Sequence, residues 1–472
     1  MPNHPSAPGQ PGARIESGNV LTAAHSPVPF QTTRSVFAYL ALVAGLIPVS
    51  QHSELLGAPL VLVAILAGWR DLRPISRVLL LLVGLSGTAA LLWTPQALAD
   101  AAGNTTRLTA LVIAVMLLSA TLGKSRDLSA LSGGLFVGRP LPRYLSLTFA
   151  TGFLAVPLNF GSVGVMSALI KRVMELRGDS ALTRNAARAV LRGFAFSSIA
   201  SPLSISVAIA LTFLPGLHAW ELIAVSLPFA VAYLLLGAAF RESEGVPTID
   251  ASVSPGNEAG AAQLLPWLRF AAYIGAICVG TFGLSGWGGM PYSRAVAVSC
   301  VTAVAIGLLF RRTRGEPVAL PSMAPIGNEL AIMSGSAFLG VLASSAGLQM
   351  LGLGFGLPAW AYPVAAFMVP WLMFFGGMLG LNPIVTGTLA GAMLSSIWPP
   401  SALLGLGFGL VSGWGLTVSG TPYSANSLLL SRITGYNAQA AALRWNLRLS
   451  LWSLLLAGAI GSALTHVLGA GA

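Results

Sequence analysis

Long apolar segments, separated by short polar or basic stretches, recur along the chain from residue 35 to its end. Most are about 17–25 residues long, the length that an α-helix needs to cross a lipid bilayer. The pattern therefore predicts an all-α polytopic membrane protein with about eleven transmembrane helices. We expect these helices at residues 35–50, 54–69, 77–93, 107–123, 193–214, 219–240, 267–284, 294–310, 326–346, 400–431 and 447–470.

Two further apolar stretches, 144–174 and 359–398, are too long for one span, and a turn interrupts each of them near its middle. The interruptions read Pro157-Leu158-Asn159-Phe160-Gly161 and Gly380-Leu381-Asn382-Pro383. Non-helical backbone is tolerated at membrane depth only where it is buried in protein or lines a cavity. We therefore predict two re-entrant hairpins with asparagine at their tips.

Basic residues cluster in the polar stretches between the apolar segments, which under the positive-inside rule marks those stretches as cytoplasmic. Every cluster falls on the cytoplasmic side when the N-terminus is cytoplasmic and the C-terminus periplasmic. This predicts a multi-pass protein of the cell inner membrane. We expect a disordered cytoplasmic tail at 1–34, which is polar and rich in proline, a first transmembrane helix at 35–53, and a cytoplasmic linker at 241–266.

The regions on either side of the linker carry similar features in the same order. Three pairs of markers lie 220 to 224 residues apart: Gly103-Asn104 and Gly327-Asn328, Asn159 and Asn382, Ser201-Pro202 and Thr421-Pro422. The predicted topology runs the first copy from outside to inside before its hairpin, and the second copy in the opposite sense. We therefore predict an inverted repeat, with a first copy at 54–240 containing hairpin 144–174 and a second copy at 267–472 containing hairpin 359–398.

Composition excludes a water-soluble protein, because only 8% of the 472 residues are charged and 55% are hydrophobic, whereas soluble domains have about 25% charged residues. The net charge of +11 is scattered between apolar segments and does not form one basic stripe, so we expect no nucleic-acid partner. We place no acidic or basic residue in the middle of a span. Because proton relays use intramembrane carboxylates or histidines, this favours Na⁺ coupling or exchange, although proton coupling through Glu329, near a span end, stays open.

Inverted repeats with interrupted helices are typical of secondary transporters, whose binding site lies near the membrane midplane. A proline break exposes N–H groups of one half-helix and carbonyl groups of the other; the first attract anions, and the second can ligate Na⁺ beside hydroxyls and amides. The candidate substrate-binding residues are Asn159, Gly161, Ser162, Ser201, Pro202, Asn382, Pro383, Thr386, Thr421 and Pro422. The candidate Na⁺ ligands are Asn159, Ser198, Asn382 and Ser419, and no other cofactor is expected.

With two asparagine-tipped hairpins and two Ser/Thr-Pro breaks, residues 54–470 resemble the divalent anion–sodium symporters of the ion transporter superfamily. The hairpin tips of that family carry Ser-Asn-Thr; here the asparagines match, and the flanking serine and threonine are displaced or absent. The resemblance implies a small organic anion, a di- or tricarboxylate, held with Na⁺ at the tip asparagines. It also implies elevator-type movement of the hairpin-bearing domain and a homodimer.

Other functions compete with that of a Na⁺-coupled carrier. A proton-coupled or exchange carrier, or an exporter of another anion, would use the same architecture. A channel would need a continuous wet path, which two opposed hairpins disfavour. Gly283-Leu284-Ser285-Gly286 has the form of an element of intramembrane serine hydrolases, but no histidine lies on a recognisable catalytic helix. We therefore expect that the protein is not an enzyme.

Two other patterns have structural interpretations. Glycines at 405, 409 and 413 form a smooth helix face that predicts close helix packing. Arg184, Arg188 and Arg192 share one helical face and predict a cytoplasmic interfacial helix that contacts anionic lipid headgroups.

Overall fold

The computed structural model describes residues 30–47, 51–123, 135–136, 138–244, 261–352 and 355–469, and the regular elements in these ranges are all helical. Most of the predicted tail and of the predicted linker lie outside the described residues. The α-helices are α1 (Gln31–Leu46), α2 (Gln51–Leu66), α3 (Pro74–Trp93), α4 (Pro95–Leu122), α6 (Pro140–Leu158), α7 (Phe160–Arg177), α8 (Ala181–Ala200), α9 (Ile205–Phe213), α10 (Ala219–Ala239), α11 (Ala261–Gly286), α12 (Tyr292–Thr313), α13 (Gly327–Leu351), α14 (Ala361–Met378), α15 (Pro383–Ser395), α16 (Leu403–Gly420), α17 (Ala425–Thr434) and α18 (Leu447–Gly469).

Ten segments built from these helices are long and apolar enough to cross a membrane. They confirm the prediction of an all-α, membrane-type architecture. In the described part of the chain, α1 and α2 are shorter, with 16 residues each. The segments counted as long enough include α14, the first helix of the second predicted hairpin.

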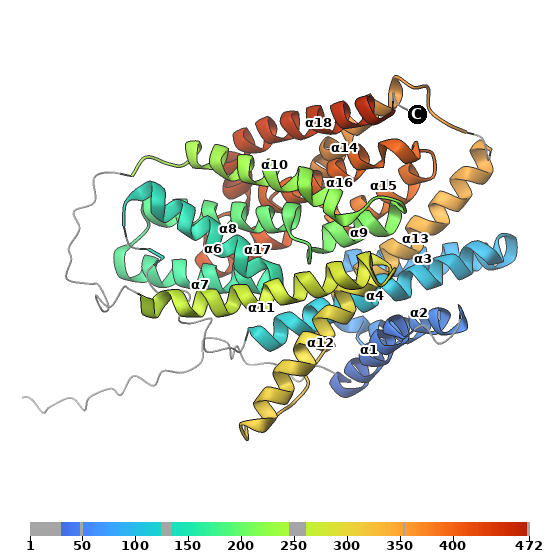
Figure 1. Ribbon diagram of the computed structural model, residues 1–472, viewed down its shortest axis with the longest axis horizontal. Helices are drawn as coiled ribbons and strands as arrows, with labels where there is room; N and C mark the ends of the chain where they lie inside the picture. Colours follow the sequence, from blue (N-terminus) through green and yellow to red (C-terminus); the bar gives the residue numbers. More distant parts are fainter. Residues whose placement is uncertain are drawn as a thin grey trace, which may run out of the picture.

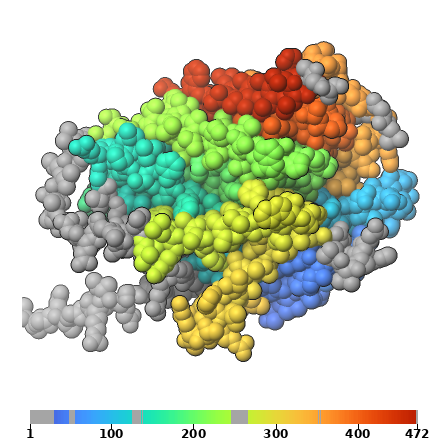
Figure 2. Space-filling model, viewed as in Figure 1, coloured from blue at the N-terminus to red at the C-terminus, as the bar shows by residue number. Residues whose placement is uncertain are grey.

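The helices pack in two groups (Figure 1). In one group α4 packs against α1, α2, α12 and α13, and α3 packs against α13. In the other, α16 packs against α8, α14 and α18, while α6 packs against α8. Helices α9 and α15 connect the groups, because α15 packs against α13 as well as α16, and α9 packs against α12 and α15. Helix α11 runs across the face of the molecule seen in Figure 2.

The predicted interruptions of the apolar stretches are present as helix boundaries. Helices α6 and α7 meet at Asn159, and α14 and α15 are joined by residues 379–382. Helices α8 and α9 are separated by residues 201–204, and α16 and α17 by residues 421–424. Each boundary lies at the proline, glycine or asparagine that predicted it.

The predicted start of the span at 107–123 is wrong, because α4 begins twelve residues earlier at Pro95. Proline fits the first turn of a helix, where its missing N–H costs nothing, and the later polar residues Asn104, Thr105 and Thr106 are buried by neighbouring helices. Arg107 is therefore the thirteenth of 28 helical residues. Arg107 thus lies within the helix and not at its start, where the predicted span began.

The three arginines of α8 do not form the predicted interfacial face. Arg192 is fully buried and donates to the Tyr144 hydroxyl at 2.9 Å and to the Gly237 carbonyl at 2.7 Å. Arg184 and Arg188 both bind the Glu242 carboxylate, at 2.6 and 3.1 Å. The hydrogen bond from Arg184, with help from Arg188, lowers the pKa of Glu242. The lipid interpretation is therefore wrong, because these side chains contact protein.

The glycine face of α16 packs closely, as predicted. A Cβ atom on Gly405 would lie 2.7 Å from the Gly461 carbonyl oxygen of α18, and one on Gly413 would lie 2.8 Å from the Pro370 Cα of α14. These separations leave no room for a side chain. Glycine therefore permits the contact that holds α14, α16 and α18 together.

Candidate functional site

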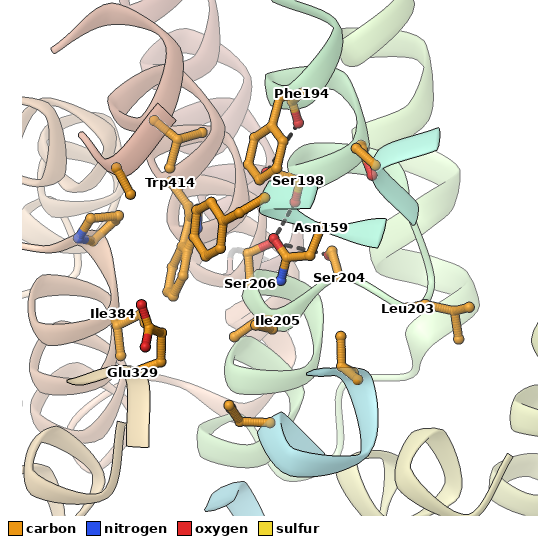
Figure 3. Close-up of a pocket in the computed structure, with 18 of the residues that line it drawn as sticks. Asn159, Phe194, Ser198, Leu203, Ser204, Ile205, Ser206, Glu329, Ile384 and Trp414 are labelled. Carbon is orange, nitrogen blue, oxygen red and sulfur yellow. Dashed lines mark hydrogen bonds between the residues drawn. The ribbon is translucent and has the colours of Figure 1, made fainter. Parts of the chain in front are cut away.

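A cavity lies where both helix–helix turns and both helix breaks come together (Figure 3). Its volume is about 60 Å³, which is space for a few water molecules, since one water needs roughly 10–15 Å³. In Figure 3, Asn159, Ser198, Ser204 and Ser206 lie on one side of the cavity, and Glu329, Ile384 and Trp414 lie on the other. The cavity is thus the place where residues far apart in the sequence meet.

Four helices begin at the wall of this cavity. The lining includes the first residues, or the residues just before them, of α7, α9, α15 and α17: Asn159, Phe160, Ser204, Ile205, Asn382, Pro383, Ser424 and Ala425. The first N–H groups of a helix have no partner within the helix and carry a partial positive charge. Four such ends around one small space make it favourable for an anion.

The first break follows from Pro202. Because proline has no N–H, the Ser198 carbonyl four residues earlier loses its helical donor. The Ser206 hydroxyl from α9 donates to that carbonyl instead, and the Ser204 side chain caps α9 by accepting from the Val207 N–H at 3.3 Å. Ser198, Ser204 and Ser206 all line the cavity.

The second break repeats this arrangement at positions 220 residues later. Pro422 frees the Val418 carbonyl, which accepts from the Ser424 hydroxyl at 2.9 Å and from the Asn426 amide at 3.5 Å. Ser424 also caps α17 by accepting from the Ser427 N–H at 3.2 Å. The polar side chains after each proline therefore replace the hydrogen bond that the proline removes, so both breaks are stable in an apolar interior.

The turn between α6 and α7 places Asn159 in an unusual backbone conformation, with φ 48° and ψ −127°. This region is adopted readily by glycine and costs other residues roughly 1–3 kcal/mol. The turn is held by the Ser162 hydroxyl, which donates to the Asn159 carbonyl at 2.7 Å, and by the Ser119 hydroxyl of α4, which donates to the Leu158 carbonyl at 2.7 Å. The Asn159 side chain makes no hydrogen bond to a described residue and lines the cavity.

The turn between α14 and α15 uses different residues for the same purposes. Gly380 takes the positive φ, at 89°. Asn382 has an ordinary extended backbone, and its side chain caps α15 by accepting from the Ile384 N–H at 2.9 Å. Asn382 and Pro383 line the cavity.

Glu329 lines the cavity from the first turn of α13. The residue is partly buried, and no basic group of the described residues lies within ion-pair distance of its carboxylate. Sequence reasoning placed Glu329 near a span end, which is correct, but missed that the cavity reaches that end. Trp414, Ser204 and Ser424 were also missed, although the serines follow each break proline by two residues, as helix caps do.

The remaining candidate residues do not line this cavity. Ser162, Thr421, Pro422 and Ser419 are buried in the helix packing, and Ser419 hydrogen-bonds the Tyr233 hydroxyl at 3.0 Å. Thr386 lies one turn into α15, and Gly161 is exposed at the start of α7. Ser201 and Pro202 line a separate apolar groove beside α11.

The chain matches no protein-family model and no curated protein. The function is therefore argued from this cavity.

Proposed function

We propose that the protein is a secondary active transporter that carries a small organic anion, a di- or tricarboxylate, through the cavity at the two turns and two breaks. The observation that carries the proposal is the convergence of four helix N-termini on one small cavity, lined by both polar and apolar residues, inside a membrane-type helical protein. Helix ends bind an anion without a fixed positive side chain. An ion held in this way can be released, as transport requires.

In this proposal, α6–α7 and α14–α15 are re-entrant hairpins, and residues 54–240 and 267–472 form an inverted repeat. The equivalence of the two breaks supports the repeat, because carbonyls 198 and 418 are satisfied by side chains at equivalent positions, 206 and 426. The resemblance to the divalent anion–sodium symporters extends this to elevator-type alternating access and a homodimer. We place the protein in the cell inner membrane, with a cytoplasmic N-terminus and a periplasmic C-terminus.

We further propose Na⁺ as the coupling ion. Asn159, Asn382 and Ser198 line the same cavity and carry amide, hydroxyl and carbonyl oxygens, and Na⁺ is a hard cation that prefers such ligands. A cation also offsets the repulsion between a bound anion and the Glu329 carboxylate. Coupling then follows from electrostatics, because the anion binds more strongly when the cation is present.

Uptake of radiolabelled succinate and citrate into proteoliposomes tests this proposal. We expect saturable uptake that an inward Na⁺ gradient stimulates and an equal K⁺ gradient does not. Asn437, which is exposed and caps the segment before α18, offers the matched control Asn437→Asp. Saturable uptake that is the same in Asn159→Gly, Asn382→Ser and the control would reject the site. Ohmic current without saturation would indicate a channel.

Glu329 favours a second candidate, a proton-coupled carrier. A carboxylate beside a bound anion is neutralised by a proton as well as by Na⁺. In that case an inward proton gradient stimulates uptake without Na⁺, and Glu329→Gln removes the stimulation while exchange across the membrane persists. Stimulation by Na⁺ alone, unchanged in Glu329→Gln, would exclude this candidate.

A further inference from the structure

A second cavity lies between the two groups of helices, nearer to the N-terminus of α4 than the first cavity. It is lined on α4 by Gln96, Asp100, Asn104 and Arg107, and on the other side by Thr212 and Phe213 of α9 and by Ser395 and Ser396 at the end of α15. It shares no lining residue with the first cavity. The two cavities therefore lie at opposite ends of α9 and of α15.

Arg107 brings to this second cavity a positive charge that pairs with no carboxylate of the described residues. It lies within α4, is partly buried, and its Nε atom is buried without a hydrogen-bond partner. Among the described residues no carboxylate lies within ion-pair distance of its guanidinium. Asp100 is exposed and two helical turns away, about 10 Å along the axis. An arginine inside a membrane helix is costly unless it has a counter-ion or a functional role.

Asn104 adds a second unsatisfied donor on the same face of α4. The residue is 5% exposed, and its Nδ2 atom has no hydrogen-bond partner among the described residues. Residues three apart on a helix are neighbours, so Asn104 and Arg107 lie on the same face of α4, and both line the cavity. Buried amides are almost always hydrogen-bonded. The two groups share a preference for a ligand that accepts hydrogen bonds and carries negative charge.

We propose that Arg107 and Asn104 form a second anion-binding site, which takes the carboxylate group of a small organic anion. The guanidinium supplies the charge and a forked pair of donors that matches a carboxylate, and the amide supplies a further donor. Asp100, which is exposed and lines the same cavity, repels the anion and shortens the time for which it stays bound.

The location of the site gives it a role that rests on the proposed transport function. Arg107 is five residues from Val112, which lines the first cavity, or about 8 Å along α4. An anion bound at Arg107 is therefore close to the helix ends of the first cavity, in the same interface between the two groups of helices. The second site holds the substrate on the far side of the interface from Glu329, on the side that the predicted topology makes periplasmic.

Cysteine alkylation in the purified full-length protein tests the site without relying on transport. Ser396 is exposed and lines the cavity, so Ser396→Cys is introduced after Cys278 and Cys300 are replaced by alanine. Its reaction rates are measured with a sulfonate-bearing and a trimethylammonium-bearing methanethiosulfonate of similar size. We expect Arg107→Gln to lower the ratio of the anionic to the cationic rate about 3–10-fold, and Asp100→Asn to raise it.

Succinate provides the second readout, because it should slow the alkylation of Ser396→Cys when Arg107 is present and not in Arg107→Gln. Arg107→Lys keeps the charge and should keep most of the rate ratio, whereas the exposed Arg312→Gln is the matched control and should change neither readout. A rate ratio unchanged in Arg107→Gln, or succinate protection that survives it, overturns the proposal. If the wild-type protein shows no saturable uptake, the proposed transport function is rejected. The alkylation test of the Arg107 site remains valid in that case, because it does not measure transport.

Discussion

The two turns at the cavity carry the same residue in different structural roles. In the first turn Asn159 itself adopts the positive φ, and its amide makes no hydrogen bond to a described residue. In the second turn Gly380 adopts the positive φ, and the Asn382 side chain caps α15. The positive φ is therefore strained in the first turn, where an asparagine adopts it, and not in the second, where a glycine does.

This difference suggests that Asn159 serves ligand binding, whereas Asn382 serves mainly to stabilise the fold. Asparagine tolerates left-handed conformations better than most residues, but glycine would be cheaper still at position 159. Strain that persists at a cavity wall is a reason to infer a function for the side chain that causes it. Asn159 is thus the better candidate for contact with a ligand, whereas Asn382 divides its side chain between the α15 cap and the cavity.

The largest expected effect is on transport in Asn159→Gly. This change relieves the backbone and removes the amide, so the protein should unfold at the wild-type temperature or higher. Loss of a hydrogen bond to a charged ligand costs about 1.5–3 kcal/mol, so uptake at subsaturating substrate should fall about 10- to 150-fold. Asn159→Ala should lose uptake equally and be destabilised as well. Normal uptake in a stable Asn159→Gly protein would contradict the assignment of the amide.

The reverse change in the second turn should affect stability more than transport. Gly380→Ala forces a Cβ atom into the positive-φ conformation, which costs about 1–2 kcal/mol. Thermal unfolding in detergent should show the loss, while the KM for uptake changes little because Gly380 does not line the cavity. An unchanged unfolding temperature would show that the turn relaxes to another conformation.

The cap at Asn382 gives a third, smaller test. Asn382→Ala should lower the free energy of unfolding by about 1 kcal/mol through the lost N-cap, and Asn382→Ser should restore most of it. If the Nδ2 group also contacts substrate, both variants should show reduced uptake. Recovery of uptake together with stability in Asn382→Ser would restrict Asn382 to capping.

The helix boundaries at the two turns and two breaks could be predicted from the sequence because each has a local cause. Proline removes one hydrogen bond at a known distance along the chain, and glycine and asparagine permit turns, so the breaks at Pro202 and Pro422 and the turns at Asn159 and Asn382 were readable directly. The length of apolar stretches likewise indicated the membrane-type architecture. These signals do not depend on which helices are neighbours.

The missed features depend on contacts between distant segments. The first twelve residues of α4 look too polar for a span, yet the helix includes them, and other helices bury Asn104, Thr105 and Thr106. Arg107 therefore lies well inside α4 and not at its start. Glu329 reaches the cavity only because α13 packs against α15. Ser198 faces the cavity while Ser201, three residues later, faces the apolar groove, a difference set by how α8 is rotated in the bundle.

The smallest expected difference concerns the hydroxyls that follow each turn. Ser162 donates to the Asn159 carbonyl at 2.7 Å, whereas Thr386 reaches the Pro383 carbonyl only at 3.4 Å. Ser162→Ala should therefore cost about 1 kcal/mol, within the usual range for a buried hydrogen bond, and Thr386→Val should cost less than about 0.5 kcal/mol. Chemical or thermal unfolding of the pair measures the difference. Equal losses would mean that the strained first turn needs no more support than the second, and the proposed link between strain at Asn159 and ligand binding would lose its structural basis.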